Sequence, residues 1–314
     1  MPLKRPMGYR AKELVTRKRI LQKFLMLLIL LTLLGLVVVL HINLRNQGGN
    51  ERRELRSLFE SGEYEGAYLL SSELLSENPL DFFLLTAHGY SAYQLAIAQI
   101  NSFYTFTYLD DCIWSLRKAL LVREDMPEVH YVLGKAYYHK GSFYVDLAIT
   151  YLEQARTASF LAADIPEYLG LSYALVGDYR SSIEAFSLAL SGEYSNNSPS
   201  EDLLMDIARS YRELGENESA VAYLRHCIAI SRDSSKVAEA RLLLAGTIFD
   251  TGNHEEAEAE FLLFLEENGD NAEAFFMLGE IYLSRGDTTR ARAEWRRAYN
   301  VDRFYPPARN RLSL

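Results

Sequence analysis

A pattern of small and aromatic residues that recurs along the chain limits the folds open to it. In residues 166–190 its members are Leu169, Gly170, Tyr173, Gly177, Ser182, Phe186 and Ala189. This spacing predicts two short antiparallel helices, joined by a turn at Gly177, whose axes approach closely where the residues are small. An isolated helix pair cannot bury its apolar face, so the pattern requires further copies stacked against it.

Seven copies of the pattern can be followed, in units near 51–81, 82–127, 128–163, 164–196, 201–234, 238–271 and 272–305. In the last three units the residues equivalent to Gly170 are Ala208, Ala245 and Gly279. Their successive separations are 38, 37 and 34 residues. The period is broken by an insertion around 99–109 and by a looser connector at 192–201, where the array has a candidate point of flexibility.

The period and the small and aromatic residues of these helix pairs resemble those of the tetratricopeptide repeat family. The resemblance covers about residues 51–305. It implies an all-α superhelix of about seven helix pairs, in which the first helix of each pair lines a concave surface that binds other proteins. Residues 306–314 are predicted to form a short capping helix, because Pro306 and Pro307 suit a first helical turn.

The N-terminal region predicts a membrane anchor. Residues 24–42 contain no Lys, Arg, Asp or Glu, and as a helix they span roughly 28 Å, close to the apolar thickness of a bilayer. A cleaved signal peptide is the competing interpretation, but no small-x-small cleavage site follows the run. Eight Lys or Arg residues in the arm 1–23 place the N terminus in the cytoplasm. The linker 43–50 then leads to repeats in the periplasm of a bacterial cell, behind a single-pass anchor in the inner (cytoplasmic) membrane.

Composition argues against nucleic-acid binding and catalysis. The net charge is −9, and the arm 1–23 contributes +7, so the rest of the chain carries −16 and repels phosphates. The six histidines are scattered, the two cysteines do not form a CxxC pair, and no nucleotide-binding or nucleophile motif occurs. We therefore expect no catalytic residue, no cofactor, no metal site and no enzymatic activity.

The repeat register predicts which side chains face the concave groove: Tyr131, Lys135, Tyr138, Leu171, Met205, Arg209, Arg212, Phe249, Phe276 and Glu280. Aromatic and apolar side chains of this kind suit helical or extended apolar segments of partner proteins. The alternative is that these aromatics pack between repeats and meet no partner. Too few of the groove residues are basic for a carboxylate clamp.

The insertion of the second unit is a second candidate binding element, through Phe103, Tyr104, Phe106 and Tyr108. Its alternation is compatible with a strand-like lip. The favoured interpretation is that it extends the helices of this unit and buries the rings locally. Otherwise the rings form an exposed aromatic patch, which often marks an interaction site.

The layout resembles single-span periplasmic tetratricopeptide repeat proteins of two kinds. One kind is a scaffold that assembles or stabilises a cell-envelope complex, for instance a periplasmic flagellar motor or collar. The other is a holdase chaperone for secreted or membrane proteins. We expect the scaffold, tethered to the lipid bilayer through residues 24–42, and the residues do not define the partner or the oligomeric state.

Overall fold

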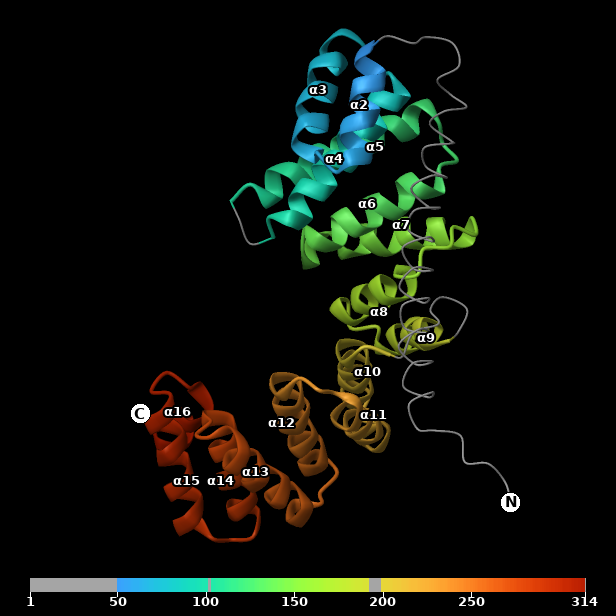
Figure 1. Ribbon diagram of the computed structural model, residues 1–314. Helices are drawn as coiled ribbons and strands as arrows, with labels where there is room; N and C mark the ends of the chain where they lie inside the picture. Colours follow the sequence, from blue (N-terminus) through green and yellow to red (C-terminus); the bar gives the residue numbers. More distant parts are fainter. Residues whose placement is uncertain (1–49, 101–102, 192–198, 314) are drawn as a thin grey trace, which may run out of the picture. The chain divides into compact units, whose positions relative to one another are not determined.

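The computed structural model describes residues 50–100, 103–191 and 199–313 (Figure 1). Within these ranges the chain forms fifteen α-helices and one short 3-10 helix, and no strand, which confirms the all-α prediction for the described residues. The predicted arm 1–23 and span 24–42 lie outside the described part. No helix inside it is both long and apolar enough to cross a bilayer.

The chain divides into two compact units, with unit 1 ending at Glu124 and unit 2 beginning at Asp125. The described helices of unit 1 are α2 (Asn50–Ser61), α3 (Tyr64–Glu77), α4 (Phe82–Ala98) and α5 (Thr105–Val122). Each packs against the next along the chain. No strand-like lip occurs at the described insertion residues, because α5 begins at Thr105, directly after the aromatic pair Phe103 and Tyr104.

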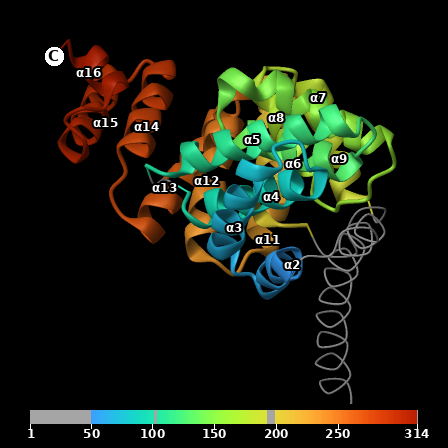
Figure 2. The ribbon, with the colours of Figure 1, turned by 90° about the horizontal axis from the view of Figure 1, so that it is seen from above.

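Unit 2 continues the succession of helix pairs. Its elements are α6 (Pro127–His139), η1 (Ser142–Tyr144), α7 (Val145–Thr157), α8 (Ile165–Leu175), α9 (Tyr179–Leu190), α10 (Glu201–Glu213), α11 (Asn217–Ile230), α12 (Ser234–Asp250), α13 (His254–Asn268), α14 (Ala272–Ser284), α15 (Thr288–Val301) and α16 (Pro306–Leu312). The last three lie side by side in Figure 2, where α15 packs against both α14 and α16.

The turn at Gly177 shows how the sequence ends one helix and starts the next. Gly177 has a φ of +79°, in the left-handed region that glycine adopts without a steric penalty. The N–H of Asp178 donates to the carbonyl of Tyr173 at 2.9 Å, which closes α8. The Asp178 side chain then accepts from the N–H of Ser181 at 3.2 Å and caps α9.

The small residues allow the two helices of a pair to approach closely, as predicted. A Cβ added to Gly170 would lie 2.4 Å from the ring of Phe186, and one added to Gly279 would lie 2.4 Å from the indole of Trp295. Both contacts are shorter than any normal van der Waals distance, so the large ring of the second helix occupies the space that a side chain would need. Glycine here is a packing requirement.

The two cysteines belong to this core. Cys112 of α5 and Cys227 of α11 are free thiols and fully buried. Burial raises the pKa of both thiols, which keeps them protonated and unreactive. Each thiol thus behaves as a small buried hydrophobe.

Helix contacts also define the inner side of unit 2. The first helices of successive pairs contact one another: α6 with α8, α8 with α10, α10 with α12, and α12 with α14. The second helices reach the neighbouring pair mainly through its first helix. The first helices are therefore the more closely spaced set, and the row that they form lies on the inside of the bend between pairs.

Candidate functional site

We call the side of α6, α8, α10, α12 and α14 that carries the predicted groove residues the inner row. Those residues are Tyr131, Lys135 and Tyr138 on α6, Leu171 on α8, Arg209 and Arg212 on α10, Phe249 on α12, and Phe276 and Glu280 on α14. The inner row lies wholly within unit 2.

Tyr131 and Lys135 belong to a hydrogen-bonded network that joins α6 to the start of α8. The Tyr131 hydroxyl donates to the two carboxylate oxygens of Asp164, at 2.7 and 2.9 Å. The Lys135 ammonium donates to Asp164 Oδ2 at 2.6 Å and to the Tyr131 hydroxyl oxygen at 3.0 Å. Burial, and then the Asp164 charge, raise the pKa of Tyr131 far above its ordinary value. This network holds two repeats together.

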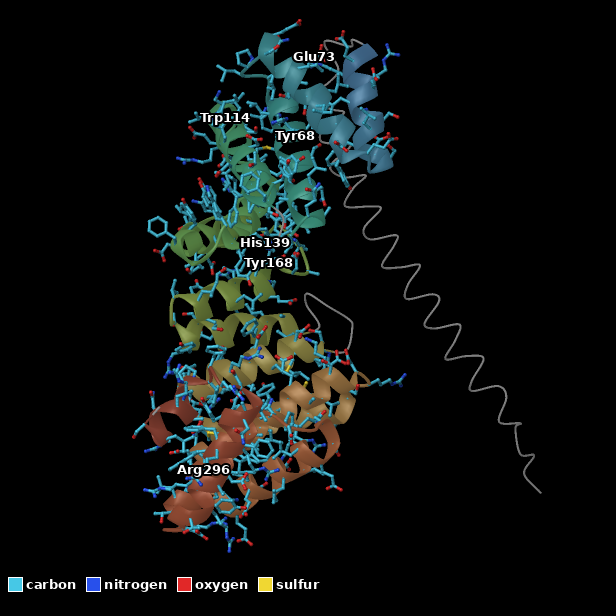
Figure 3. The ribbon with its side chains drawn as sticks, turned by 90° about the vertical axis from the view of Figure 1, so that its left-hand side faces the viewer. Tyr68, Glu73, Trp114, His139, Tyr168 and Arg296 are labelled. Atoms are coloured by element: carbon cyan, nitrogen blue, oxygen red, sulfur yellow. The ribbon has the colours of Figure 1, made fainter. Side chains whose placement is uncertain are left out.

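A ring cluster extends the network along α6 and α8. The Tyr168 ring meets the Tyr138 ring edge to face, with centroids 5.2 Å apart, and its hydroxyl lies 3.2 Å from His139 Nε2 (Figure 3). The Lys135 ammonium lies 4.6 Å from the Tyr168 ring centroid. Burial, and then the Lys135 charge, lower the pKa of His139 to about 4, so His139 is neutral at pH 7.

Arg209 and Arg212 tie α10 to α12. Arg209 donates to Asp206 at 2.8 Å on its own helix and to Glu239 at 2.7 Å across the gap. Arg212 donates to Asp250 at 2.8 Å. All these groups keep substantial exposure, so each pair contributes little to stability. They fix the positions of charges on a surface that remains accessible to solvent.

Two carboxyl groups of the inner row are held in an environment that disfavours charge. Burial, and then nearby carboxylates including Asp164 and Asp206, raise the pKa of Glu167. Burial also raises the pKa of Asp206, although its hydrogen bond with Arg209 opposes the shift. Glu167 forms no ion pair with any described residue. The middle of the inner row therefore holds two half-buried carboxyl groups, Glu167 and Asp206, whose charged forms are disfavoured by burial.

Met205 does not face the groove, and its assignment there is corrected. Its side chain is 1% exposed and belongs to the core between α10 and the following helices. The helix surface that the register assigned to the groove is covered at this point by the neighbouring pair. Leu171 is half-buried, and packs against the core cluster of Phe186, Leu203 and Ile207.

The remaining inner-row residues each have a partner within unit 2. Phe249 stacks on His254, with centroids 4.9 Å apart, and Phe276 meets Tyr305 edge to face at 5.8 Å. Glu280 accepts two hydrogen bonds from Arg311, at 2.8 and 2.5 Å. Both rings are half-buried and pack against the core. They serve the packing between repeats and leave part of each ring toward solvent.

Asp164, which completes the Tyr131 network, is not among the predicted groove residues. A signal for it exists in the sequence: an acidic residue stands six positions before the small residue of each repeat in unit 2. These residues are Glu128, Asp164, Asp202, Glu239 and Glu273. Asp164, Asp202 and Glu239 form ion pairs with cations of the inner helices. The rest of this acidic series remains open to solvent or a partner.

The aromatic insertion differs from its favoured interpretation. Phe103, Tyr104 and Phe106 are 89%, 60% and 57% exposed, so these rings are not buried locally. Only Tyr108 turns inward, where its ring meets Tyr68 edge to face at 5.4 Å. Helix α5 extends back to Thr105, but Phe103 and Tyr104 precede it and Phe106 is exposed on its first turn, so these three rings remain in solvent.

The described residues of the inner row present charged groups and partly exposed rings. No set of three His, Cys, Asp or Glu side chains among them has the geometry to hold a metal ion. The perturbed groups of the inner row are tyrosines, a neutral histidine and carboxyls, all explained by burial and by one another. What this arrangement can do is present fixed charges and partly exposed rings to another polypeptide.

Comparison with known proteins agrees with this arrangement. A family model described as tetratricopeptide repeat matches residues 205–270 and 263–308. No curated protein sequence matches the chain. The described fold and this match together support the tetratricopeptide repeat family, whose members generally mediate protein–protein interaction.

Solved structures extend the likeness over most of the chain. The C-terminal part of a TPR repeat-containing protein from Cytophaga hutchinsonii is 14% identical, has a TM-score of 0.60, and the match covers 82% of this chain and 98% of that one. A tetratricopeptide repeat protein from Parabacteroides merdae is 17% identical and has a TM-score of 0.50, and the match covers 83% of this chain and 97% of that one. PilF from Pseudomonas aeruginosa is 13% identical and has a TM-score of 0.51, and the match covers 72% of this chain and 96% of that one. At these identities the likeness is one of fold.

Proposed function

We propose, from the tetratricopeptide repeat fold of the described residues, that this chain is a membrane-tethered scaffold. Its inner row would hold partner proteins and so assemble or stabilise a complex of the bacterial cell envelope, such as a periplasmic flagellar motor or collar. Residues 24–42 would anchor it in the inner membrane, with the repeats in the periplasm. Tethering raises the effective concentration of partners held in the same membrane.

One observation carries the scaffold proposal: the inner row is already ordered before a partner arrives. Lys135, Arg209 and Arg212 each donate to a carboxylate on a neighbouring inner helix, at 2.6, 2.7 and 2.8 Å. A surface whose side chains are fixed in advance loses little conformational entropy on binding. Fixed charges also reject partners of the wrong pattern. Both properties suit a dedicated partner.

The same surface is less suited to the alternative, a periplasmic holdase. A holdase needs an adaptable apolar surface, often rich in methionine, that accepts many unfolded segments. On the inner row Met205 is in the core, and Phe249 and Phe276 are half-buried against their neighbours. The geometry therefore favours the scaffold. An experiment that identifies the bound proteins can distinguish the two functions.

Affinity purification of the full-length protein from detergent-solubilised membranes, followed by mass spectrometry, tests the proposal. We expect one dominant set of partners at fixed stoichiometry that persists when salt is raised. The variant Arg209→Ala/Arg212→Ala should lose these partners. The matched variant Arg180→Ala/Arg232→Ala, which changes exposed arginines outside the inner row, should keep them. A broad spectrum of weakly held secreted proteins would support the holdase instead.

The tether is tested separately by cell fractionation. Replacing Leu30 and Leu33 by Arg places two charges in the middle of the proposed span, at about 2.5–3.5 kcal/mol each on an insertion scale. We expect the wild-type chain to remain with the membrane after alkaline extraction and the double variant to be released. Membrane retention of both would show that residues 24–42 are not the anchor.

A further inference from the structure

Unit 1 carries a cleft that the inner row does not explain. It lies between α3 and α5, the second helices of their pairs, and has a volume of about 770 Å³. We call it the α3–α5 cleft. The residues that matter for its properties are Tyr68 of α3 and Asp111, Trp114, Arg117, Lys118 and Leu121 of α5. Tyr68 and Trp114 can be followed in Figure 3.

The apolar side chains of this cleft are exposed, and no described part of the chain covers them. Trp114 is 53% exposed and Leu121 is 82% exposed. The core side of α5 is formed by other residues, Leu109, Cys112, Leu116 and Ala119, which are all fully buried. Helix α5 is therefore apolar on two sides, and only one of them is needed for packing. Large apolar side chains left on a surface often mark an interaction site.

The wall opposite Trp114 is rigid. The Tyr68 hydroxyl donates to Asp111 at 2.5 Å, and the Tyr68 ring stacks on His88 with centroids 4.5 Å apart. His88 lies 3.0 Å from the hydroxyl of Ser71 and is almost fully buried. Because these contacts hold Tyr68 in place, the cleft exists before any partner is bound.

The lining of the cleft contains two carboxylates, Asp110 and Asp111, and two cations, Arg117 and Lys118. From residue 57 to residue 116 the sequence has no Lys or Arg. Its carboxylates in that stretch are Glu60, Glu63, Glu65, Glu73, Glu77, Asp81, Asp110 and Asp111. Arg117 and Lys118 then follow as a pair, and neither forms an ion pair with a described residue. The Lys118 ammonium lies 3.6 Å from the centroid of the Trp114 ring. Two cations with no carboxylate partner thus flank an exposed indole.

We propose that the α3–α5 cleft docks a segment of a partner protein that combines a bulky apolar side chain with carboxylates. The apolar side chain packs on Trp114 and Leu121, and the carboxylates pair with Arg117 and Lys118. An exposed Trp beside an Arg is the composition that dominates binding energy at protein interfaces. This surface is separate from the inner row, so the protein has two docking surfaces, and either can fail a test without the other.

Two matched peptides test the proposal on the full-length protein in detergent. The first is a fluorescein-labelled helical peptide with Leu and Phe on one face and Glu beside them, and the second has every Glu replaced by Lys. Fluorescence anisotropy measures both affinities at low and high salt. We expect the Glu peptide to bind at least about tenfold more tightly than the Lys peptide, with a difference that shrinks as salt rises.

Variants assign the binding to the cleft. Arg117→Glu/Lys118→Glu should weaken the Glu peptide at least about tenfold and reverse the preference toward the Lys peptide. Trp114→Ala/Leu121→Ala should weaken it by a similar factor. Arg292→Glu/Arg296→Glu is the matched control, because these exposed arginines of α15 also form no ion pair with a described residue, and it should change nothing. Circular dichroism checks that each variant is folded. If Trp114→Ala/Leu121→Ala does not fold, the result of Arg117→Glu/Lys118→Glu alone decides the test.

Three results would overturn the proposal. The first is equal binding of the two peptides, or no saturable binding of the Glu peptide. The second is an equal loss in the Arg292/Arg296 control, which would make the effect one of general charge. The third is binding of phosphatidylglycerol vesicles that is lost in Arg117→Glu/Lys118→Glu while the Glu peptide fails to bind, which would make the surface a lipid contact.

Discussion

The inner row of unit 2 and the α3–α5 cleft of unit 1 use the same residue types in opposite ways. On the inner row Lys135 donates to Asp164 at 2.6 Å, and the phenol of Tyr131 is bonded to the same carboxylate. In the cleft, Lys118 lies over an exposed indole and has no carboxylate partner among the described residues. A cation beside an aromatic ring thus supports the fold in one region and is left for a partner in the other.

Helix spacing accounts for this difference. First helices of successive pairs contact one another, so a side chain on α6 reaches the start of α8. The α3–α5 cleft lies between two second helices, which are held together through α4. Across the cleft, the Tyr68 hydroxyl donates to Asp111, whereas Arg117 and Lys118 form no ion pair with a described residue. The inner helices therefore pair their own charged groups, whereas the cleft leaves Arg117 and Lys118 without an ionic partner among the described residues.

The largest expected effect comes from removing Tyr131. Tyr131→Ala deletes a half-buried ring and leaves Asp164 and Lys135 without their shared hydroxyl, so the free energy of unfolding should fall by about 3 kcal/mol. Urea unfolding followed by circular dichroism measures it, with Tyr131→Phe as a control that loses about 1 kcal/mol. If Tyr131→Ala weakened partner binding and left stability unchanged, Tyr131 would be a groove residue and the contrast between the two regions would fail.

The next effect concerns the charge of Asp164. Asp164→Asn removes the carboxylate that pairs with the Lys135 ammonium, whose side chain is 14% exposed, so stability should fall by about 2 kcal/mol. The matched change Asp250→Asn breaks the exposed pair with Arg212 and should lower stability by less than about 1 kcal/mol. Equal losses would show that the Asp164 pair behaves as a surface ion pair.

His139 sharpens the comparison through pH. Its pKa of about 4 in the folded protein lies below the ordinary value of 6.5, so between these pH values the unfolded chain binds a proton that the folded chain does not. Stability therefore falls as pH drops from about 6.5 to about 4. Allowing for partial exposure, the loss due to His139 should be about 1–2 kcal/mol.

His139→Gln isolates this contribution, because raised carboxyl pKa values act with the opposite sign. The pKa values of Glu167 and Asp206 are raised, so their protonation on acidification favours the folded state. The stability difference between wild type and His139→Gln, measured from pH 7 to pH 4, should grow on the acid side in favour of the variant. A stability difference that does not change with pH would show that His139 does not contribute to the loss of stability in acid.

The smallest effects on stability are expected in the α3–α5 cleft. Trp114→Ala should lower the free energy of unfolding by about 1 kcal/mol or less, and Leu121→Ala and Arg117→Ala by less than about 0.5 kcal/mol, because these side chains are exposed. Thermal unfolding of each variant measures this. A loss from Trp114→Ala as large as that from Tyr131→Ala would mean that the indole is part of the fold.

Much of the candidate site follows from the sequence, because helix register is local. The repeat spacing places Tyr131, Lys135 and Arg209 on the inner helices, and the structure brings each into contact with a neighbouring inner helix. The same register misplaces Met205, which is 1% exposed. Register fixes the direction in which a side chain leaves its helix, but the distance to the next helix decides whether that direction ends in solvent or in the core.

What the sequence by itself determined is the succession of helix pairs. Glycine at the turn, as at Gly177, and glycine at the close approach, as at Gly170, act within a few residues or between adjacent helices. Tertiary structure alone decided that Tyr131 and Lys135 share Asp164, that Phe103 lies in solvent, and that Trp114 borders a cleft. The reason is that these outcomes depend on how far apart neighbouring pairs stack, which is set by the packing of whole repeats.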